Sequence, residues 1–162
     1  HPNPCRSLLM LEISDLAPDF SLPRDGGSEV NLSDLHGSAV VLFFYPRDDT
    51  PGCSKESIGL SHALQALADL GVQVFGISKD TVAKHEKFIT KHQLTTPLLS
   101  DENGTTCEDY DVWKEKNLYG KKHWGIERST FLIGSDGKIL RIWRKVKVPG
   151  HVEEVLEAAK AL

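Results

Sequence analysis

The sequence has few cysteines and no long apolar run. Only three cysteines occur among 162 residues, and they stand far apart at Cys5, Cys53 and Cys107. So small and odd a number does not form the disulfide framework of a small secreted protein. No apolar stretch reaches the length that a membrane-spanning helix needs. We therefore expect a cytoplasmic protein that does not associate with membranes.

An excess of charge of one sign is also missing. Lysine and arginine number 19 against 23 aspartates and glutamates, so the net charge is −4. This balance gives no reason to expect a nucleic-acid partner. The seven histidines are scattered without the spacing of a zinc site. We expect neither a metal nor another cofactor, and we place His85 and His92 on the surface of a helix.

Methionine occurs once, as Met10, directly before a stretch that reads as the start of a globular domain. Residues 1–9 lack the basic and apolar regions of a signal peptide, and we interpret them as a tag or extension. Cys5 would then lie outside the native chemistry. Residues 10–162 have the length of one domain, and no linker or repeat divides them.

The most informative stretch is residues 45–56, which read YPRDDTPGCSKE. Before it, the apolar run Ala39–Phe44 predicts a buried strand, and after it a helical pattern continues to Ala68. Cys53 therefore lies where a helix begins. The unpaired N–H groups and partial positive charge of a helix N-terminus favour a thiolate. These features predict a reactive cysteine.

The pattern around this stretch predicts an α/β domain. An N-terminal β-hairpin is expected from two short strands, Phe20–Leu22 and Glu29–Asn31, followed by one helical turn capped by Ser33. Further along we expect a strand over Val72–Ile77, a helix over Thr81–His92 capped by Asp80, and an edge strand over Pro97–Ser100. Two successive strand–helix pairs indicate parallel strands with helices on the faces of the sheet.

The last third of the chain changes pattern. We expect a brief helix over Thr106–Tyr110, an irregular basic loop over Lys114–Gly125, a hairpin of strands Ser129–Ile133 and Ile139–Trp143, and a closing helix over Val152–Ala161. This order is the outline of a thioredoxin-like fold, in which a central mixed sheet is flanked by helices.

The spacing Pro46-x-x-x-Thr50-x-x-Cys53 resembles the active-site signature of peroxiredoxins. The fuller motif of residues 45–56 resembles the peroxiredoxin Q branch, also called bacterioferritin comigratory protein. Residues 119–133 are similar to the stretch that carries the second active-site residue of that family, here Arg128, and residues 143–148 match its C-terminal strand region. The likeness extends over residues 11–162.

The resemblance implies a thiol-dependent peroxidase acting on hydrogen peroxide and organic hydroperoxides. Cys53 would be the nucleophile, Thr50 would hydrogen-bond its sulfur and the substrate, and Pro46 would shield the pocket. Arg128 would contact the sulfur and the peroxide oxygens. Glu56 either orients Arg128 or only complements the positive end of the helix.

The chain departs from its relatives in the cysteine that would resolve the sulfenic acid on Cys53. Many relatives carry that cysteine five residues later, where this chain has Ile58, and others carry it in the following helix, where residues 87–90 contain none. Cys107 is the other cysteine of the domain, and we expect a semi-buried structural residue. We therefore predict a one-cysteine mechanism in which thioredoxin, glutaredoxin or a small thiol is the reductant.

Three further expectations accompany this mechanism. The protein would be a monomer or a weak homodimer. Alternatives are a redox sensor in which oxidised Cys53 signals to a partner, and a two-cysteine peroxidase that uses Cys107. The first turns after Cys53 should unwind during reduction, because Ser54, Ser57 and Gly59 are weak helix formers.

Overall fold

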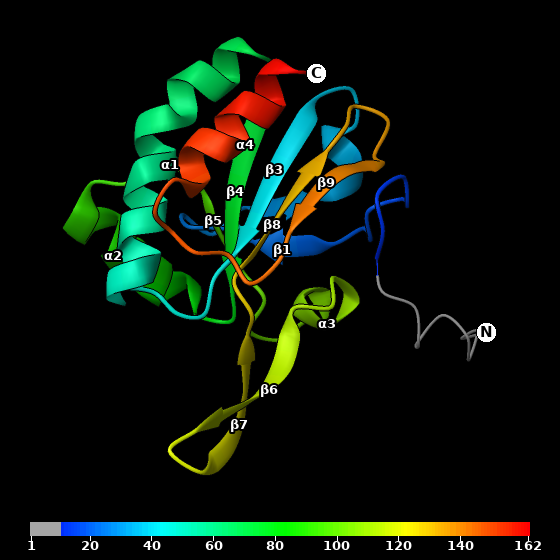
Figure 1. Cartoon of the computed structure of the whole chain (residues 1–162). Coiled ribbons are helices and arrows are strands. Elements are labelled where there is room, and N and C mark those ends of the chain that lie inside the picture. The colour runs from blue at the N-terminus through cyan, green and yellow to red at the C-terminus, as the bar shows by residue number, and fades with distance from the viewer. Residues whose placement is uncertain (1–10) are drawn as a thin grey trace.

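A five-stranded mixed sheet forms the centre of the computed structural model, which describes residues 11–162 (Figure 1). The interpretations of residues 1–9 and of Cys5 lie outside these residues. The strand order is β5-β4-β3-β8-β9. The strands are β3 (Ala39–Phe44), β4 (Val72–Ser78), β5 (Leu98–Ser100), β8 (Ser129–Ile133) and β9 (Ile139–Trp143). Strands β3, β4 and β5 are parallel, whereas β8 pairs antiparallel with both β3 and β9.

Helices cover both faces of this sheet. They are α1 (Pro51–Asp69), α2 (Val82–His92), α3 (Thr106–Asp109) and α4 (His151–Lys160). Helices α1 and α4 lie together on one face, and a 3-10 helix, η2 (Leu32–Leu35), belongs to the N-terminal part (Figure 1). Among the described residues, no helix is both long enough and apolar enough to cross a membrane.

Strand β3 separates two hydrophobic cores. Successive side chains of a strand point to opposite faces, so Val41 and Phe43 pack with α1, α2 and α4, while Leu42 and Phe44 pack with α3 and the N-terminal hairpin. Every residue of β3 is buried. Burial on both faces explains why this strand is continuously apolar in the sequence.

Two small hairpins flank the sheet. The expected N-terminal hairpin is present as β1 (Ser21–Pro23) and β2 (Glu29–Asn31). The prediction of an irregular loop over residues 114–125 is wrong. Strands β6 (Trp113–Leu118) and β7 (Lys121–Ile126) form a hairpin there that projects away from the sheet (Figure 1). Its two-residue turn, Tyr119 and Gly120, has φ values of 51° and 76°. Positive φ at both turn positions suits the twist of paired strands.

Three local predictions also need correction. Thr81, not Asp80, caps α2, because its side chain accepts from the Lys84 N–H, whereas Asp80 binds Ser78 and the loop before α1. Ser33 lies inside the 3-10 turn, and Asn31 is the N-cap. The prediction that His85 is on the surface is wrong: its side chain is fully buried.

Candidate active site

Cys53 is the third residue of α1 and is fully buried. Strand β3 ends at Phe44, the loop of residues 45–50 reverses the chain, and Thr50 is the N-cap of the helix. The first bond of the helix runs from the Ser54 N–H to the Thr50 carbonyl at 2.8 Å. The Cys53 N–H thus belongs to the first turn, whose donors have no partner within the helix. The sulfur therefore lies at the positive end of α1, as the sequence predicted.

Arg128 contacts Cys53 at the end of the sheet where β3 ends and β8 begins. Its Nη2 donates to Sγ of Cys53 at 3.1 Å, and its Nη1 donates to Oε1 of Glu56 at 2.6 Å. The pairing of β3 with β8 explains this meeting, because Phe44 at the end of β3 lies opposite Ser129 at the start of β8. Arg128 therefore projects over the helix that follows β3. One planar guanidinium contacts both side chains, which a lysine cannot do with the same geometry.

Glu56 is fully buried beneath Arg128. Burial raises the pKa of Glu56 from 4.5 to about 7, although the charge of Arg128 opposes this shift. Its second oxygen, Oε2, has no hydrogen-bond partner among the described residues and lies 3.8 Å from Nε2 of His151. A carboxyl group that titrates near neutrality thus stands behind the arginine.

Two further residues near the site, His151 and Lys116, were not predicted from the sequence. His151 begins α4, its Nε2 lies 2.7 Å from Oγ1 of Thr130, and burial lowers its pKa. Lys116 belongs to β6, and its Nζ donates to the Ile126 carbonyl at 2.6 Å. Burial lowers the pKa of Lys116, and the positive charge of Arg128 adds to the effect. Both residues come from elements that reach the site only through the tertiary fold.

Thr50 and Pro46 lie on the loop before Cys53. The Thr50 hydroxyl donates to the Arg47 carbonyl at 3.2 Å, so in this structure it is engaged within the loop. Pro46 is exposed on the same loop. Their roles toward the sulfur and the peroxide therefore stay predictions.

A buried hydrogen-bond network fixes this loop to the rest of the domain. Asp48 accepts from the Tyr45 hydroxyl at 2.6 Å, and its other oxygen lies 2.7 Å from Nδ1 of His85. Nε2 of His85 lies 2.9 Å from the Leu99 carbonyl. Both ring nitrogens of His85 therefore lie within hydrogen-bond distance of oxygen atoms of the domain. The Asp48 N–H also donates to Asp80 at 2.7 Å.

Asp48, Asp80 and His85 also form the one group of metal-type ligands found among residues 11–162, with ligand atoms within 4.8 Å of one another. Both ring nitrogens of His85 lie within hydrogen-bond distance of other groups of the domain, with Asp48 at Nδ1 and the Leu99 carbonyl at Nε2. We interpret the group as the anchor of the active-site loop.

Cys107 lies on the other side of the sheet from Cys53. It packs in the core that contains Leu42 and Phe44, whereas Cys53 packs in the core of α1, α2 and α4. Cys107 is fully buried, and its burial together with the charge of Asp101 raises its pKa far above the ordinary value. Both cysteines are free. We expected Cys107 to be semi-buried, and the structure shows complete burial.

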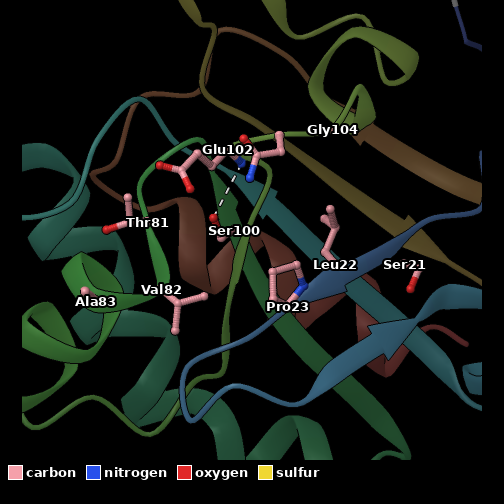
Figure 2. A pocket seen from close by; sticks show the side chains of 10 residues that line it. Ser21, Leu22, Pro23, Thr81, Val82, Ala83, Ser100, Glu102 and Gly104 are labelled. Carbon is pink, nitrogen blue, oxygen red and sulfur yellow. Dashed lines mark hydrogen bonds between the residues drawn. The ribbon is translucent and has the colours of Figure 1, made fainter.

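A cavity of about 430 Å³ between β1 and the start of α2 contains none of these residues. Figure 2 shows Leu22 and Pro23 on one side of it and Thr81 and Val82 on the other. The hydrogen bond drawn there joins the Glu102 N–H to Oγ of Ser100 at 3.4 Å. This lining contains no cysteine, histidine or arginine.

Comparison with known proteins agrees with this arrangement. Residues 13–142 match the AhpC/TSA family. A putative peroxiredoxin bcp of Coxiella burnetii is 50% identical over 148 residues, which are 91% of this chain and 98% of that protein.

Two solved structures are also similar. The bacterioferritin comigratory protein of Xanthomonas campestris, described with an alkyl peroxide reduction activity, has 41% identity and a TM-score of 0.86, and the match covers 93% of this chain and 96% of that one. A yeast mitochondrial 1-Cys peroxiredoxin, whose thiol resolving mechanism is described as working via glutathione/thioredoxin systems, has 27% identity and a TM-score of 0.80. The match covers 94% of this chain and 76% of that one.

Proposed function

The chain belongs to the AhpC/TSA family and is a thiol-dependent peroxidase of the peroxiredoxin Q type, and from this premise we propose that it works with one catalytic cysteine, Cys53. The observation that carries the proposal is the contact of 3.1 Å between Arg128 Nη2 and Cys53 Sγ at the start of α1. The positive charges of Arg128 and of the N-terminus of α1 stabilise a thiolate on Cys53. They also stabilise the negative charge on the peroxide oxygen that leaves.

The oxidation step follows from this geometry. The Cys53 thiolate attacks one peroxide oxygen, the S–O bond forms, the O–O bond breaks, and the electron pair leaves with the second oxygen. That oxygen takes a proton and departs as water or an alcohol, while the sulfur becomes a sulfenic acid. Arg128 stabilises the negative charge on the leaving oxygen, and Glu56 holds the guanidinium in place. Thr50 and Pro46 border the approach to the sulfur.

The substrates in this proposal are hydrogen peroxide and small organic hydroperoxides. The alkyl peroxide reduction described for the Xanthomonas campestris relative supports the organic substrates. The protein works as a monomer or weak homodimer in a reducing compartment such as the cytoplasm, where two free thiols persist.

An external thiol reduces the sulfenic acid in this mechanism. Position 58 is isoleucine, and Cys107 is buried in the core on the opposite face of the sheet. A disulfide requires two Cα atoms within about 7 Å, so Cys107 can reach Cys53 only after a large rearrangement. The glutathione and thioredoxin systems described for the yeast relative support an external donor.

Mass spectrometry after one equivalent of peroxide, without reductant, tests the mechanism. We expect a single added oxygen on Cys53, trapped by dimedone. A Cys53–Cys107 disulfide would instead establish the two-cysteine alternative. Repeated turnover with a thiol donor separates the enzyme from a redox sensor, which would react once and stop.

A further inference from the structure

A groove with a basic rim lies beside the first turn of α1. It is formed between the loop segment of residues 47–49 and helix α2, and its volume is about 470 Å³. We call it the α2 groove. Four exposed basic residues line it: Arg47, Lys84, Lys87 and Lys91. This volume lies within the range of small-molecule sites, which is about 300–1,000 Å³.

The charges of this groove are unbalanced. The side-chain nitrogens of Arg47, Lys84 and Lys87 make no ion pair or hydrogen bond with another residue of the described chain 11–162. The aspartates of the groove already have partners, because Asp48 and Asp80 belong to the buried loop anchor and Asp49 accepts from Lys91 at 2.7 Å. The groove therefore offers free positive charge to a ligand.

Contacts connect the α2 groove to the catalytic cysteine. Asp49 lies 3.0 Å from Nε2 of His92, and the same nitrogen lies 3.5 Å from Oγ of Ser54, the neighbour of Cys53. Helix α2 thus holds the beginning of α1, and the two helices lie side by side there (Figure 1). If the first turn of α1 unwinds during reduction, Cys53 is released next to these contacts.

We propose that the α2 groove binds the carboxylates of a small anionic thiol that reduces the sulfenic acid of Cys53. The inference rests on the one-cysteine function proposed above. A thiol with two carboxylates matches the two free ammonium groups of Lys84 and Lys87, which lie one turn apart on α2. Phe88 lies at the floor of the groove and is almost fully buried.

The chemistry balances with two molecules of this thiol. The first thiolate attacks the sulfur of Cys53–SOH, an S–S bond forms, the S–O bond breaks, and the oxygen leaves as water after taking a proton. The second thiolate attacks the mixed disulfide at the sulfur of the bound thiol. A symmetrical disulfide leaves and the Cys53 thiolate is restored, so two thiols are oxidised for each sulfenic acid reduced.

The test compares two small thiols of opposite charge on the full-length protein. Cys53 is first oxidised with one equivalent of hydrogen peroxide, and its reduction is then followed with glutathione, which carries two carboxylates, or with cysteamine, which is cationic. We expect the Lys84→Gln/Lys87→Gln variant to lose about tenfold in the glutathione rate constant, since two favourable surface charge contacts are removed. The cysteamine rate and the oxidation rate should not fall. Salt of about 1 M should remove most of the difference.

Lys138→Gln is the matched control, since Lys138 is an exposed lysine in the turn between β8 and β9. The same loss in this control, or equal losses with both thiols, would overturn the proposed site. A loss confined to reduction by thioredoxin would also overturn it, and would make the groove a docking surface for a protein.

Binding of S-methylglutathione to the reduced protein separates the site from the mechanism. We expect the ligand to shift the backbone amide NMR signals of positions 84–88, and we expect no such shift in the double variant. Binding without any reduction of the sulfenic acid by glutathione would retain the anion site and refute its role in reduction, whereas the one-cysteine function itself fails only if a Cys53–Cys107 disulfide forms. Reduction by glutathione without such binding would retain the function and refute the site.

Discussion

Arg128 donates to the sulfur of Cys53 at 3.1 Å although the two residues stand 75 positions apart in the sequence. The other guanidinium nitrogen holds Glu56, one turn further along α1. Glu56 thus holds the guanidinium in position while its Nη2 faces the sulfur. This preorganisation matters because a donor that is already in place stabilises developing charge without reorganising.

Cys53→Ser should abolish peroxide turnover, whereas Cys107→Ala should retain most of it with a small-thiol donor. The reason is that Cys107 lies in the opposite core, away from Arg128. Coupled consumption of peroxide and thiol measures both variants. Turnover in Cys53→Ser above the background of free thiol would contradict the assignment of the nucleophile.

Arg128→Lys should slow oxidation of Cys53 by about 10²–10³, the usual effect of removing one preorganised donor. Lysine keeps the charge but cannot contact Cys53 and Glu56 with one planar group. Stopped-flow tryptophan fluorescence measures the rate. Arg144→Lys is the control, because Arg144 donates to the backbone carbonyls of Asp111 and Tyr110. Equal rates for wild type and Arg128→Lys would mean that Arg128 has no role at the sulfur.

Glu56 should make stability depend on pH. Burial raises its pKa from 4.5 to about 7, so the folded protein holds this proton more tightly than the unfolded chain does. The free energy of unfolding should therefore decrease as the pH rises from about 4.5 to about 7, by about 3 kcal/mol in total. Below this window the contribution is fully present.

Urea unfolding at several pH values measures this dependence. Glu56→Gln should flatten it, whereas Glu154→Gln, at an exposed position of α4, should not. An unchanged slope in Glu56→Gln would show that the carboxyl titrates alike in the folded and unfolded states.

Asp48→Asn should destabilise the protein by about 2 kcal/mol, since a buried polar group left without its hydrogen-bond partner costs about 1–3 kcal/mol. The amide keeps only one acceptor oxygen, so either Nδ1 of His85 or the Tyr45 hydroxyl loses the acceptor that it has in Asp48. Urea unfolding gives the magnitude. Asp69→Asn is the control, because Asp69 accepts only an exposed bond from Gln65. Similar losses in both variants would show that the buried network does not stabilise the loop.

Gly59→Ala should slow reduction of the sulfenic acid more than its formation, because alanine favours the helix by about 1 kcal/mol and opposes unwinding. The structure adds a second effect: a Cβ at Gly59 would lie 3.0 Å from Cγ2 of Val152 on α4. The variant Gly59→Ala/Val152→Ala removes this conflict. Single-turnover measurement of the two half-reactions decides the matter. Equal changes in both half-reactions would exclude unwinding of this turn.

The sequence by itself determined the local frame of the site. Strand β3 was predicted with its observed bounds, and so were both strands of the β8–β9 hairpin. Cys53 was placed at the start of a helix, where it lies. These features depend on neighbouring residues only, because apolar periodicity, proline and glycine act within a few positions.

Elements with atypical side-chain patterns were missed. The β6–β7 hairpin carries lysines and a glutamate where strands usually alternate apolar and polar residues, so its sequence resembles a basic loop. His85 was placed on the surface because its polarity suggested solvent. Its burial depends on Asp48 and Leu99, which lie far away in the sequence.

The tertiary structure alone decided what surrounds the sulfur. The pairing of β3 with β8 brings Arg128 over Cys53, and the packing of α4 brings His151 near Glu56. The same sheet places Cys107 in the opposite core from Cys53. Such distances depend on strand order and helix packing, which combine residues from the whole chain, and no local pattern contains that information.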